Sequence, residues 1–169
     1  MLSAPQYQKE DERLDATNRP GLLNKDPDLR IDAIIKEATE KIDVPISTFT
    51  VLDKNKEHYQ SCVGLDEKEG DRAISFCGHA LLAQDLFIVP DCKKDQRFVD
   101  NPMVVGTPFI RFYAGMAIYD YMTKMPVAVF CIKDTKPRQL DVKELDIFLT
   151  LSRRIEEIIN SISPENLSV

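Results

Sequence analysis

Two apolar segments joined by a long polar loop occupy the middle of this sequence. The residue pattern predicts one strand over Leu86 to Val89 and another over Ile110 to Tyr119. The loop between them starts at Pro90-Asp91 and is rich in charged residues and proline. Structureless loops of such length are uncommon in compact domains unless they have a function. We therefore expect this loop to have a function.

Shorter signals surround these two strands. Ser75 is placed to cap a short helix that carries Cys77 and His79. Within the loop, Arg97 to Asp100 predicts a single helical turn, which Pro102 is expected to break. Segments rich in β-branched and aromatic residues predict three more strands, Ile46 to Leu52, Glu57 to Val63 and Pro126 to Lys133.

A helix is predicted ahead of the first strand. Apolar residues recur on one helical face at Ile31, Ile34, Ile35, Ala38 and Ile42. We expect this helix to begin at Asp26-Pro27-Asp28, with Asp26 as its cap and Pro27 at the first helical position. It should end before Pro45, because a residue that precedes proline is disfavoured in the helical region.

The last predicted helix is long and runs from Asp141 to about Ile162, with Asp141 and Glu144 as a capping box. Its apolar residues form a seam at near-heptad spacing, namely Leu145, Phe148, Leu151, Ile155, Ile158 and Ile162. Ile147, Leu149 and Ile159 lie outside that seam. Such a helix can bury two faces, one on a sheet and one on a partner subunit. The order of elements predicts an α+β domain with helices on the faces of a central antiparallel sheet.

Composition excludes several classes of partner. The 169 residues carry a formal net charge of -6 and the pI is about 5.0, which argues against a nucleic-acid or anionic-membrane partner. No apolar run approaches the ~20 residues that a transmembrane helix needs. The first residues have no apolar signal core, so we expect a cytoplasmic protein. One domain is expected over residues 21–162, with a flexible or helical extension at 1–20 and a tail at 163–169.

The cysteines do not form a metal-binding pattern. They stand at positions 62, 77, 92 and 131 without a CxxC pair, so free thiols are expected. Their spacing to His58 and His79 is poor for zinc. The glycines form neither a dinucleotide-binding motif nor a phosphate-binding loop. We therefore predict no metal and no nucleotide cofactor.

The helix that follows Ser75 carries the first candidate site residues, Phe76, Cys77 and His79. Backbone N–H groups at a helix start favour anions and thiolates. Cys77 and His79 can therefore line a ligand pocket or sense oxidants. Alternatively, Cys77 is a small buried residue and His79 bonds a nearby carbonyl.

The loop carries the next candidates, Asp91, Arg97, Phe98 and Asn101. Polar groups in this number can bind a small ligand. They can equally hold the loop together, and we favour that role for Asn101 and for the neighbouring Asp95. Phe98 is expected to anchor the loop to the core.

Arg111 and Tyr113 complete the candidate set. Strand alternation places both on one face, with Phe112 and Ala114 on the other. An arginine in an apolar strand is costly unless it is paired. Arg111 therefore predicts either a carboxylate partner, with Asp91 and Asp100 as the local choices, or an anionic ligand.

Two stretches resemble the GAF domains of bacterial sensory proteins. They read SFCGHA at positions 75–80 and VPDCKKDQRFVDNPMVVGTPFIRFYAG at positions 89–115. The resemblance covers residues 22 to 159 and implies a twisted antiparallel sheet of five or six strands. It also implies terminal helices on one face of that sheet and a pocket under loops and short helices on the other.

The chain departs from three GAF subtypes. Bilin-carrying GAF domains have histidine directly after the attachment cysteine, whereas Gly78 separates Cys77 from His79, so no bilin is predicted. The motif of cyclic-nucleotide-binding GAF domains is missing around residues 131–135. Free methionine-R-sulfoxide reductases match at Phe76-Cys77-Gly78, but their catalytic cysteine has no counterpart in Phe98 to Pro108.

The resemblance implies a regulatory domain for an unidentified small molecule, acting in signal transduction as a homodimer through its terminal helices. It would act in trans on a signalling enzyme or be part of a longer protein. One alternative is a ligand-free dimerisation module, whose pocket is filled by Phe98, Phe109 and Phe112. Another is a thiol redox sensor or reductase that pairs Cys77 with Cys92. No catalytic set emerges, so we do not expect an enzyme.

Overall fold

The computed structural model describes residues 1–19, 23 and 26–161. Its strands are β1 (Ile46–Leu52), β2 (Lys56–Val63), β3 (Glu69–Asp71), β4 (Phe87–Val89), β5 (Phe112–Tyr119) and β6 (Pro126–Asp134). Its α-helices are α1 (Glu10–Thr17), α2 (Leu29–Ile42), α3 (Phe76–Leu82), α4 (Pro102–Val105) and α5 (Val142–Asn160). Two 3-10 turns, η1 (Arg72–Ile74) and η2 (Cys92–Lys94), precede α3 and follow β4.

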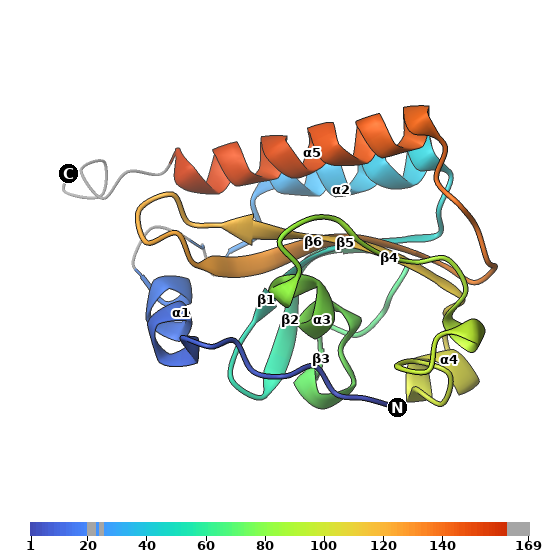
Figure 1. Cartoon of the computed structure of the whole chain (residues 1–169). Helices are drawn as coiled ribbons and strands as arrows, with labels where there is room; N and C mark the ends of the chain where they lie inside the picture. Colours follow the sequence, from blue (N-terminus) through green and yellow to red (C-terminus); the bar gives the residue numbers. More distant parts are fainter. Residues whose placement is uncertain (20–22, 24–25, 162–169) are drawn as a thin grey trace.

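Within these residues the strands form one six-stranded antiparallel sheet in the order β3-β2-β1-β6-β5-β4. Helices α2 and α5 lie side by side on one face, and α1, α3 and α4 lie on the other side (Figure 1). The predicted α+β fold with helices on both faces of a five- or six-stranded antiparallel sheet is therefore confirmed. Among the described residues, each helix is either too short or too polar to span a lipid bilayer.

Strands β1 and β6 form the centre of the sheet, and every residue of both is buried. Side chains alternate between the two faces of a strand. On β6, Phe130 and Ile132 face the core under α2 and α5, while Val129 and Cys131 face the core under α3. The two layers of the domain therefore meet at this pair of strands.

Helix α2 begins two residues later than the sequence indicated. Asp28 is the N-cap, and its carboxylate accepts a hydrogen bond of 2.9 Å from the backbone N–H of Arg30. The prediction of Asp26 as the cap was wrong, because Asp28 can satisfy both that backbone donor and the Arg30 guanidinium. The helix ends at Ile42, before Pro45 as predicted, and Asp43 adopts the left-handed conformation with a φ of 55°.

Helix α5 packs on the sheet through an apolar stripe at helical spacing. The capping box of Asp141 and Glu144 is present as predicted. The buried residues are Phe148, Leu151, Ser152, Ile155 and Ile159. The predicted seam holds at Phe148, Leu151 and Ile155 but was wrong towards both ends, because Leu145 and Ile158 are only half-buried and Ile159 is buried instead. A straight helix with 3.6 residues per turn drifts away from a heptad row. Ile162 lies outside the described residues.

Helix α1 belongs to the extension at residues 1–20 and is held by a buried arginine. Arg13 is fully buried and donates a hydrogen bond of 2.8 Å to the carbonyl oxygen of Leu52. It also pairs with Glu10 at 2.8 Å, and Arg72 binds the same carboxylate. These contacts attach α1 to the end of β1 and to η1. The expected tail at 163–169 lies outside the described residues.

Phe148 should carry a large share of the packing between α5 and the sheet. Its ring stacks on that of Phe130 at a centroid distance of 4.7 Å, and both rings are fully buried. We expect Phe148→Ala to lower the free energy of unfolding by about 3–5 kcal/mol, because the truncation leaves a cavity. Urea denaturation measures the change. Val142→Ala, on the same helix at a residue that is 85% exposed, should stay within about 0.5 kcal/mol of the wild type.

Glu10 should contribute stability that is lost in acid. Burial alone would raise its pKa, but the hydrogen bonds from Arg13 and Arg72 lower it from 4.5 to about 2. A lowered pKa stabilises the folded state above the unfolded pKa, and this contribution is lost as the pH falls. The stability difference between wild type and Glu10→Gln should therefore shrink between about pH 4.5 and about pH 2. Thermal melts across this range measure it, and a constant difference would contradict the ion-pair assignment.

Candidate functional site

An aromatic cluster joins α3, the β4–β5 loop (residues 90–111) and the sheet. Phe76 begins α3 and stacks between the rings of Phe98 and Tyr113, at centroid distances of 4.3 Å and 5.2 Å. All three side chains are buried. Phe98 therefore anchors the loop to the core, as predicted. Ser75 caps α3 by accepting a hydrogen bond from the backbone N–H of Gly78, which is also as predicted.

Polar side chains hold the loop together. Asp95 accepts hydrogen bonds from the backbone N–H of Arg97 at 2.9 Å and from its guanidinium at 2.6 Å. The guanidinium of Arg97 also lies over the ring of Phe87, 5.0 Å from its centroid. Asn101 is buried, donates to the carbonyl of Ile74 at 2.9 Å and accepts from the backbone N–H of Met103. The loop-stabilising role that the sequence favoured for Asp95 and Asn101 is thus present.

The predicted effect of Pro102 was wrong. The predicted single turn near Arg97 to Asp100 is present, since residues 96–100 form turns and the backbone N–H of Val99 donates to the carbonyl of Asp95 at 2.9 Å. Pro102, however, begins helix α4 instead of breaking a helix. Asn101 supplies the cap, and proline suits the first helical position because its missing N–H would have no intrahelical partner. The predicted strand from Ile110 also starts later, at Phe112.

Arg111 lies at the end of the loop and pairs with a carboxylate. Its guanidinium donates to Asp91 at 3.1 Å, so the two ends of the loop are tied together. Burial acts to raise the pKa of Asp91, but the Arg111 guanidinium, the backbone N–H of Lys93 and the charge of Lys94 together lower it. The carboxylate partner that the sequence offered as one of two alternatives is therefore present.

His79 lies at the outer side of α3. Its Nε2 is 2.9 Å from the carbonyl oxygen of Leu2, and its ring packs edge-on against Phe98 at 4.9 Å. Burial lowers the pKa of His79. The alternative in which His79 bonds a carbonyl is thus the one that the structure contains.

A second group of side chains lies beneath α3 on the sheet, and we call it the Lys133 cluster. Its members are polar or sulfur-containing residues, namely Thr48, Glu57, Tyr59, Ser75, Cys77, Tyr113, Cys131 and Lys133. Strand register brings them together, because Tyr113 is opposite Lys133 and Thr48 is opposite Cys131. The ring of Tyr113 also folds over Gly115, where a β-carbon would lie 2.4 Å from the tyrosine oxygen.

Lys133 is the unusual member of this cluster. The side chain is fully buried, and among the described residues its Nζ has no hydrogen-bond partner. The nitrogen lies 5.7 Å and 6.0 Å from the ring centroids of Tyr59 and Tyr113. Glu57 is also buried, and its carboxylate accepts hydrogen bonds from the hydroxyl groups of Ser75 and Tyr59. A buried ammonium without an acceptor is costly, so this atom calls for a functional explanation.

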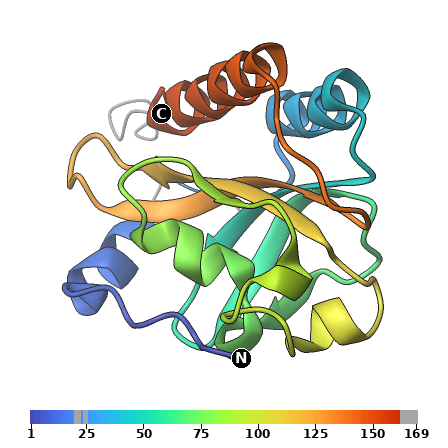
Figure 2. The ribbon, with the colours of Figure 1, turned by 45° about the vertical axis from the view of Figure 1, so that its right-hand side comes forward.

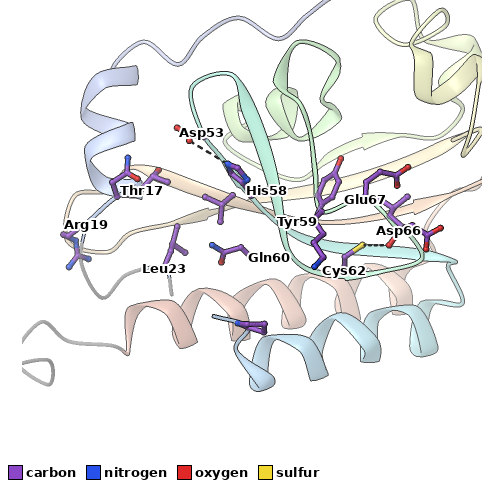
Figure 3. A pocket seen from close by; sticks show the side chains of 15 residues that line it. Thr17, Arg19, Leu23, Asp53, His58, Tyr59, Gln60, Cys62, Asp66 and Glu67 are labelled. Atoms are coloured by element: carbon purple, nitrogen blue, oxygen red, sulfur yellow. Dashed lines mark hydrogen bonds and ion pairs between the residues drawn. The ribbon is translucent and has the colours of Figure 1, made fainter. Parts of the chain in front are cut away.

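An open cavity of about 980 Å³ lies along β2, beside the cluster (Figure 3). Its lining includes Tyr59 and Cys62, and also His58, which points towards Asp53 at 3.8 Å. Tyr59 thus belongs both to the cavity wall and to the Lys133 cluster. Within the described segments no three His, Cys, Asp or Glu side chains are grouped as metal ligands.

The structure divides the predicted site residues into two groups. Phe76, Cys77, Phe98 and Tyr113 meet beneath α3. The others hold the loop or its contact with the N-terminal residues, namely His79, Asp91, Arg97, Asn101 and Arg111. Sequence reasoning missed Glu57, Tyr59, Cys131 and Lys133. Lys133 carries the same sequence signal as Arg111, a cation in an apolar strand.

Asn101 offers a test of how firmly the loop is held. We expect Asn101→Ala to lower the free energy of unfolding by about 1–3 kcal/mol, because it removes a helix cap and leaves the carbonyl of Ile74 without its donor. Hydrogen exchange at Met103 and Val104 should quicken at the same time. Val105→Ala, in the same helix at a residue that is 60% exposed, is the control. Unchanged exchange in Asn101→Ala would show that the loop does not depend on this side chain.

Known proteins similar to this chain identify its fold. No protein-family model matches the chain. A cyclic di-GMP phosphodiesterase of Pseudomonas aeruginosa is 33% identical in an alignment of 155 residues that covers 89% of this chain and 26% of that protein. The chain therefore spans about a quarter of the length of this curated relative.

Two solved structures show the architecture. A type II free methionine-R-sulfoxide reductase from Thermoplasma acidophilum has a TM-score of 0.63 and 15% identity, over 79% of this chain and 92% of that one. The GAF domain of a phosphoenolpyruvate-protein phosphotransferase from Acinetobacter has a TM-score of 0.60 and 14% identity, over 87% of this chain and 92% of that one. Identities this low show the fold alone. Together with the sheet order and the motifs at 75–80 and 89–115, they establish that the chain has the fold of a GAF domain.

Proposed function

We propose that this chain is a regulatory module that binds a small molecule beneath α3 and acts in signal transduction without being an enzyme itself. The observation that carries the proposal is the buried Nζ of Lys133, which lacks an acceptor among the described residues. Fully buried ammonium groups are rare unless they are paired. A ligand that presents a carboxylate, a phosphate or another strong acceptor would satisfy this atom.

The surroundings of Lys133 support such a ligand. The carboxylate of Glu57 already accepts from Ser75 and Tyr59. The cavity along β2 shares Tyr59 with the cluster, so movement of this one side chain would connect the cavity with Lys133. Pockets with a few placed polar groups among apolar walls are typical of small-molecule sites.

The helices on the face of the sheet opposite α3 offer a surface for dimerisation. Helices α2 and α5 lie next to each other there (Figure 2), and Arg154 of α5 pairs with Glu37 of α2 at 2.8 Å. Leu145 and Leu149 of α5 are half-buried and lie outside its buried stripe. We propose that a second copy of the chain packs on these helices. In this model the dimer has two packing arrangements. The ligand shifts the equilibrium between them only by the difference between its affinities for the two arrangements.

The matched relative suggests the partner. Because the chain resembles one part of a cyclic di-GMP phosphodiesterase, we propose that it regulates a signalling enzyme of cyclic di-GMP metabolism. The enzyme would be joined to it in one polypeptide or bound in trans.

The aromatic cluster favours a second candidate, a ligand-free dimerisation module. Phe76, Phe98 and Tyr113 fill much of the space between α3 and the sheet. This alternative expected Phe98, Phe109 and Phe112 to fill the pocket, but Phe109 is 55% exposed and Phe112 lies in the core under α2 and α5. A reductase is disfavoured, since Phe98 to Pro108 contains no cysteine.

Native mass spectrometry of gently purified protein tests the ligand and the dimer together. We expect a dimer that carries a discrete extra mass, which disappears when the protein is denatured. Lys133→Met should weaken retention of that mass at least about tenfold, which corresponds to about 1.4 kcal/mol of binding free energy. Lys136→Met, at an exposed lysine three residues later, should bind as the wild type does.

Other outcomes select among the alternatives. A dimer without extra mass, in protein from its own host and from a heterologous host, would favour the dimerisation module. A monomer at tens of micromolar, with or without extra mass, would contradict the proposed route through α2 and α5. Equal retention by Lys133→Met and the wild type would show that the ligand does not contact Lys133.

A further inference from the structure

Two buried thiols approach each other at the centre of the Lys133 cluster. Cys77 lies on α3 and Cys131 on β6, and both are fully buried. Their sulfur atoms are 3.9 Å apart, and the thiol of Cys77 donates a hydrogen bond to the sulfur of Cys131. All four cysteines are free in the structure. The juxtaposition therefore connects a short helix directly with the centre of the sheet.

A relay of donors converges on Cys131. The hydroxyl of Tyr113 donates to the sulfur of Cys77 at 3.2 Å, and Cys77 in turn donates to Cys131. The hydroxyl of Thr48 lies 3.0 Å from the sulfur of Cys131. Lys133 is two residues further along β6, so its side chain shares the face of Cys131. Donors and a cation on one sulfur are the surroundings that favour a thiolate.

The acid–base properties of the two thiols differ accordingly. Burial would raise the pKa of Cys131, but the Cys77 hydrogen bond, the charge of Lys133 and the Thr48 hydroxyl together lower it. Burial and the bond to Cys131 raise the pKa of Cys77. Because the donors and the cation are gathered around the sulfur of Cys131, we assign Cys131 as the nucleophile of the pair and Cys77 as the thiol that resolves it.

We propose that Cys131 and Cys77 form a peroxide-oxidisable dithiol, a modification site in which the two residues join reversibly as a disulfide. The proposal goes beyond the ligand-binding function and does not depend on it. It also differs from the pairing of Cys77 with Cys92 that the sequence offered. Cys92 is a buried residue of the β4–β5 loop itself, and burial together with nearby Asp91 and Asp95 raises its pKa to about 12.

The chemistry needs two electrons and one peroxide. The Cys131 thiolate attacks one oxygen of hydrogen peroxide, the O–O bond breaks, and a sulfenic acid forms while the other oxygen leaves as water after taking up a proton. Cys77 then loses its proton and attacks the sulfenic sulfur, whose oxygen leaves as a second water. Overall, two thiols are oxidised to one disulfide and one peroxide is reduced to two waters.

Closing the bond changes the position of α3. The sulfur atoms must approach from 3.9 Å to about 2.05 Å, and β6 is held by neighbours on both sides. The movement therefore falls mainly on α3, which has seven residues. Its Phe76 stacks on Phe98 of the loop, so oxidation would be transmitted to the β4–β5 loop.

Oxidation of the folded protein with hydrogen peroxide tests the proposal. The protein is treated near neutral pH, blocked with an alkylating agent in acid denaturant and measured by intact mass and peptide mapping without reductant. We expect the loss of two hydrogen atoms, a crosslinked peptide that joins residues 77 and 131, and full reversal by a dithiol reductant. Cys77→Ser and Cys131→Ser should each lose the crosslink, whereas Cys62→Ser and Cys92→Ser should keep it.

Lys133→Met separates the electrostatic role of the lysine from a structural one. We expect it to slow crosslinking near neutral pH at least about tenfold, since each unit of pKa increase reduces the thiolate fraction tenfold. The midpoint of the pH–rate profile of crosslinking by hydrogen peroxide should move upwards in the same variant, a shift that a merely structural lysine would not cause.

Three results would overturn the proposal. They are a crosslink between Cys77 and Cys92, four alkylatable thiols after peroxide treatment, and oxygen addition to Cys131 without a crosslink. The assay uses reduced protein and needs no ligand. Its failure would therefore leave the native mass spectrometry result intact, and the reverse also holds.

Discussion

The burial of β6 on both faces is the constraint on which the rest of this domain depends. Alternation along the strand sends Phe130 and Ile132 into the core under α2 and α5, and Cys131 and Lys133 into the space under α3. A slip of one residue in register would exchange these two sets. It would then place an ammonium and a thiol under α5 and a phenylalanine in the Lys133 cluster. The register of one strand therefore specifies both the scaffold and the candidate site.

Lys133 is a cost to stability that the rest of the fold offsets. Replacing a buried charge by an apolar residue of similar size is often neutral or stabilising, so packing alone does not require a lysine here. The charges of Glu57 and Cys131 and the faces of two tyrosines compensate the ammonium in part, but among the described residues none of them accepts a hydrogen bond from it. Sites that break the usual rules of burial are commonly functional. We therefore regard the Lys133 cluster, rather than the polar residues of the β4–β5 loop, as the chemical centre of the domain.

Local signals predicted the elements, and distant contacts decided the rest. The caps at Ser75 and Asp141 and the anchor Phe98 could be read directly, because each depends on residues nearby in sequence or on a simple apolar pattern. The N-cap of α2 and the role of Pro102 also depend on nearby residues, but the local sequence allows two arrangements at each. Asp26 or Asp28 can cap α2, and a proline can end one helix or begin the next. The burial of Arg13 against Leu52 and the meeting of Cys77 with Cys131 depend on chain segments far apart, so no periodicity could reveal them.

The packing around β6 also decides which element moves when a ligand binds in the Lys133 cluster or its thiols are oxidised. Strands β5 and β6 are fixed by hydrogen bonds on both sides and by α5 above them, whereas α3 has seven residues and little stability of its own. Its position depends on the Ser75 cap, the stacking of Phe76 and the contacts of Cys77 with Tyr113 and Cys131. All three supports involve residues of the Lys133 cluster, namely Ser75, Tyr113 and Cys77. A change of charge or bonding there therefore acts first on α3 and then, through Phe98, on the loop. It reaches α5 only if the sheet itself has two arrangements.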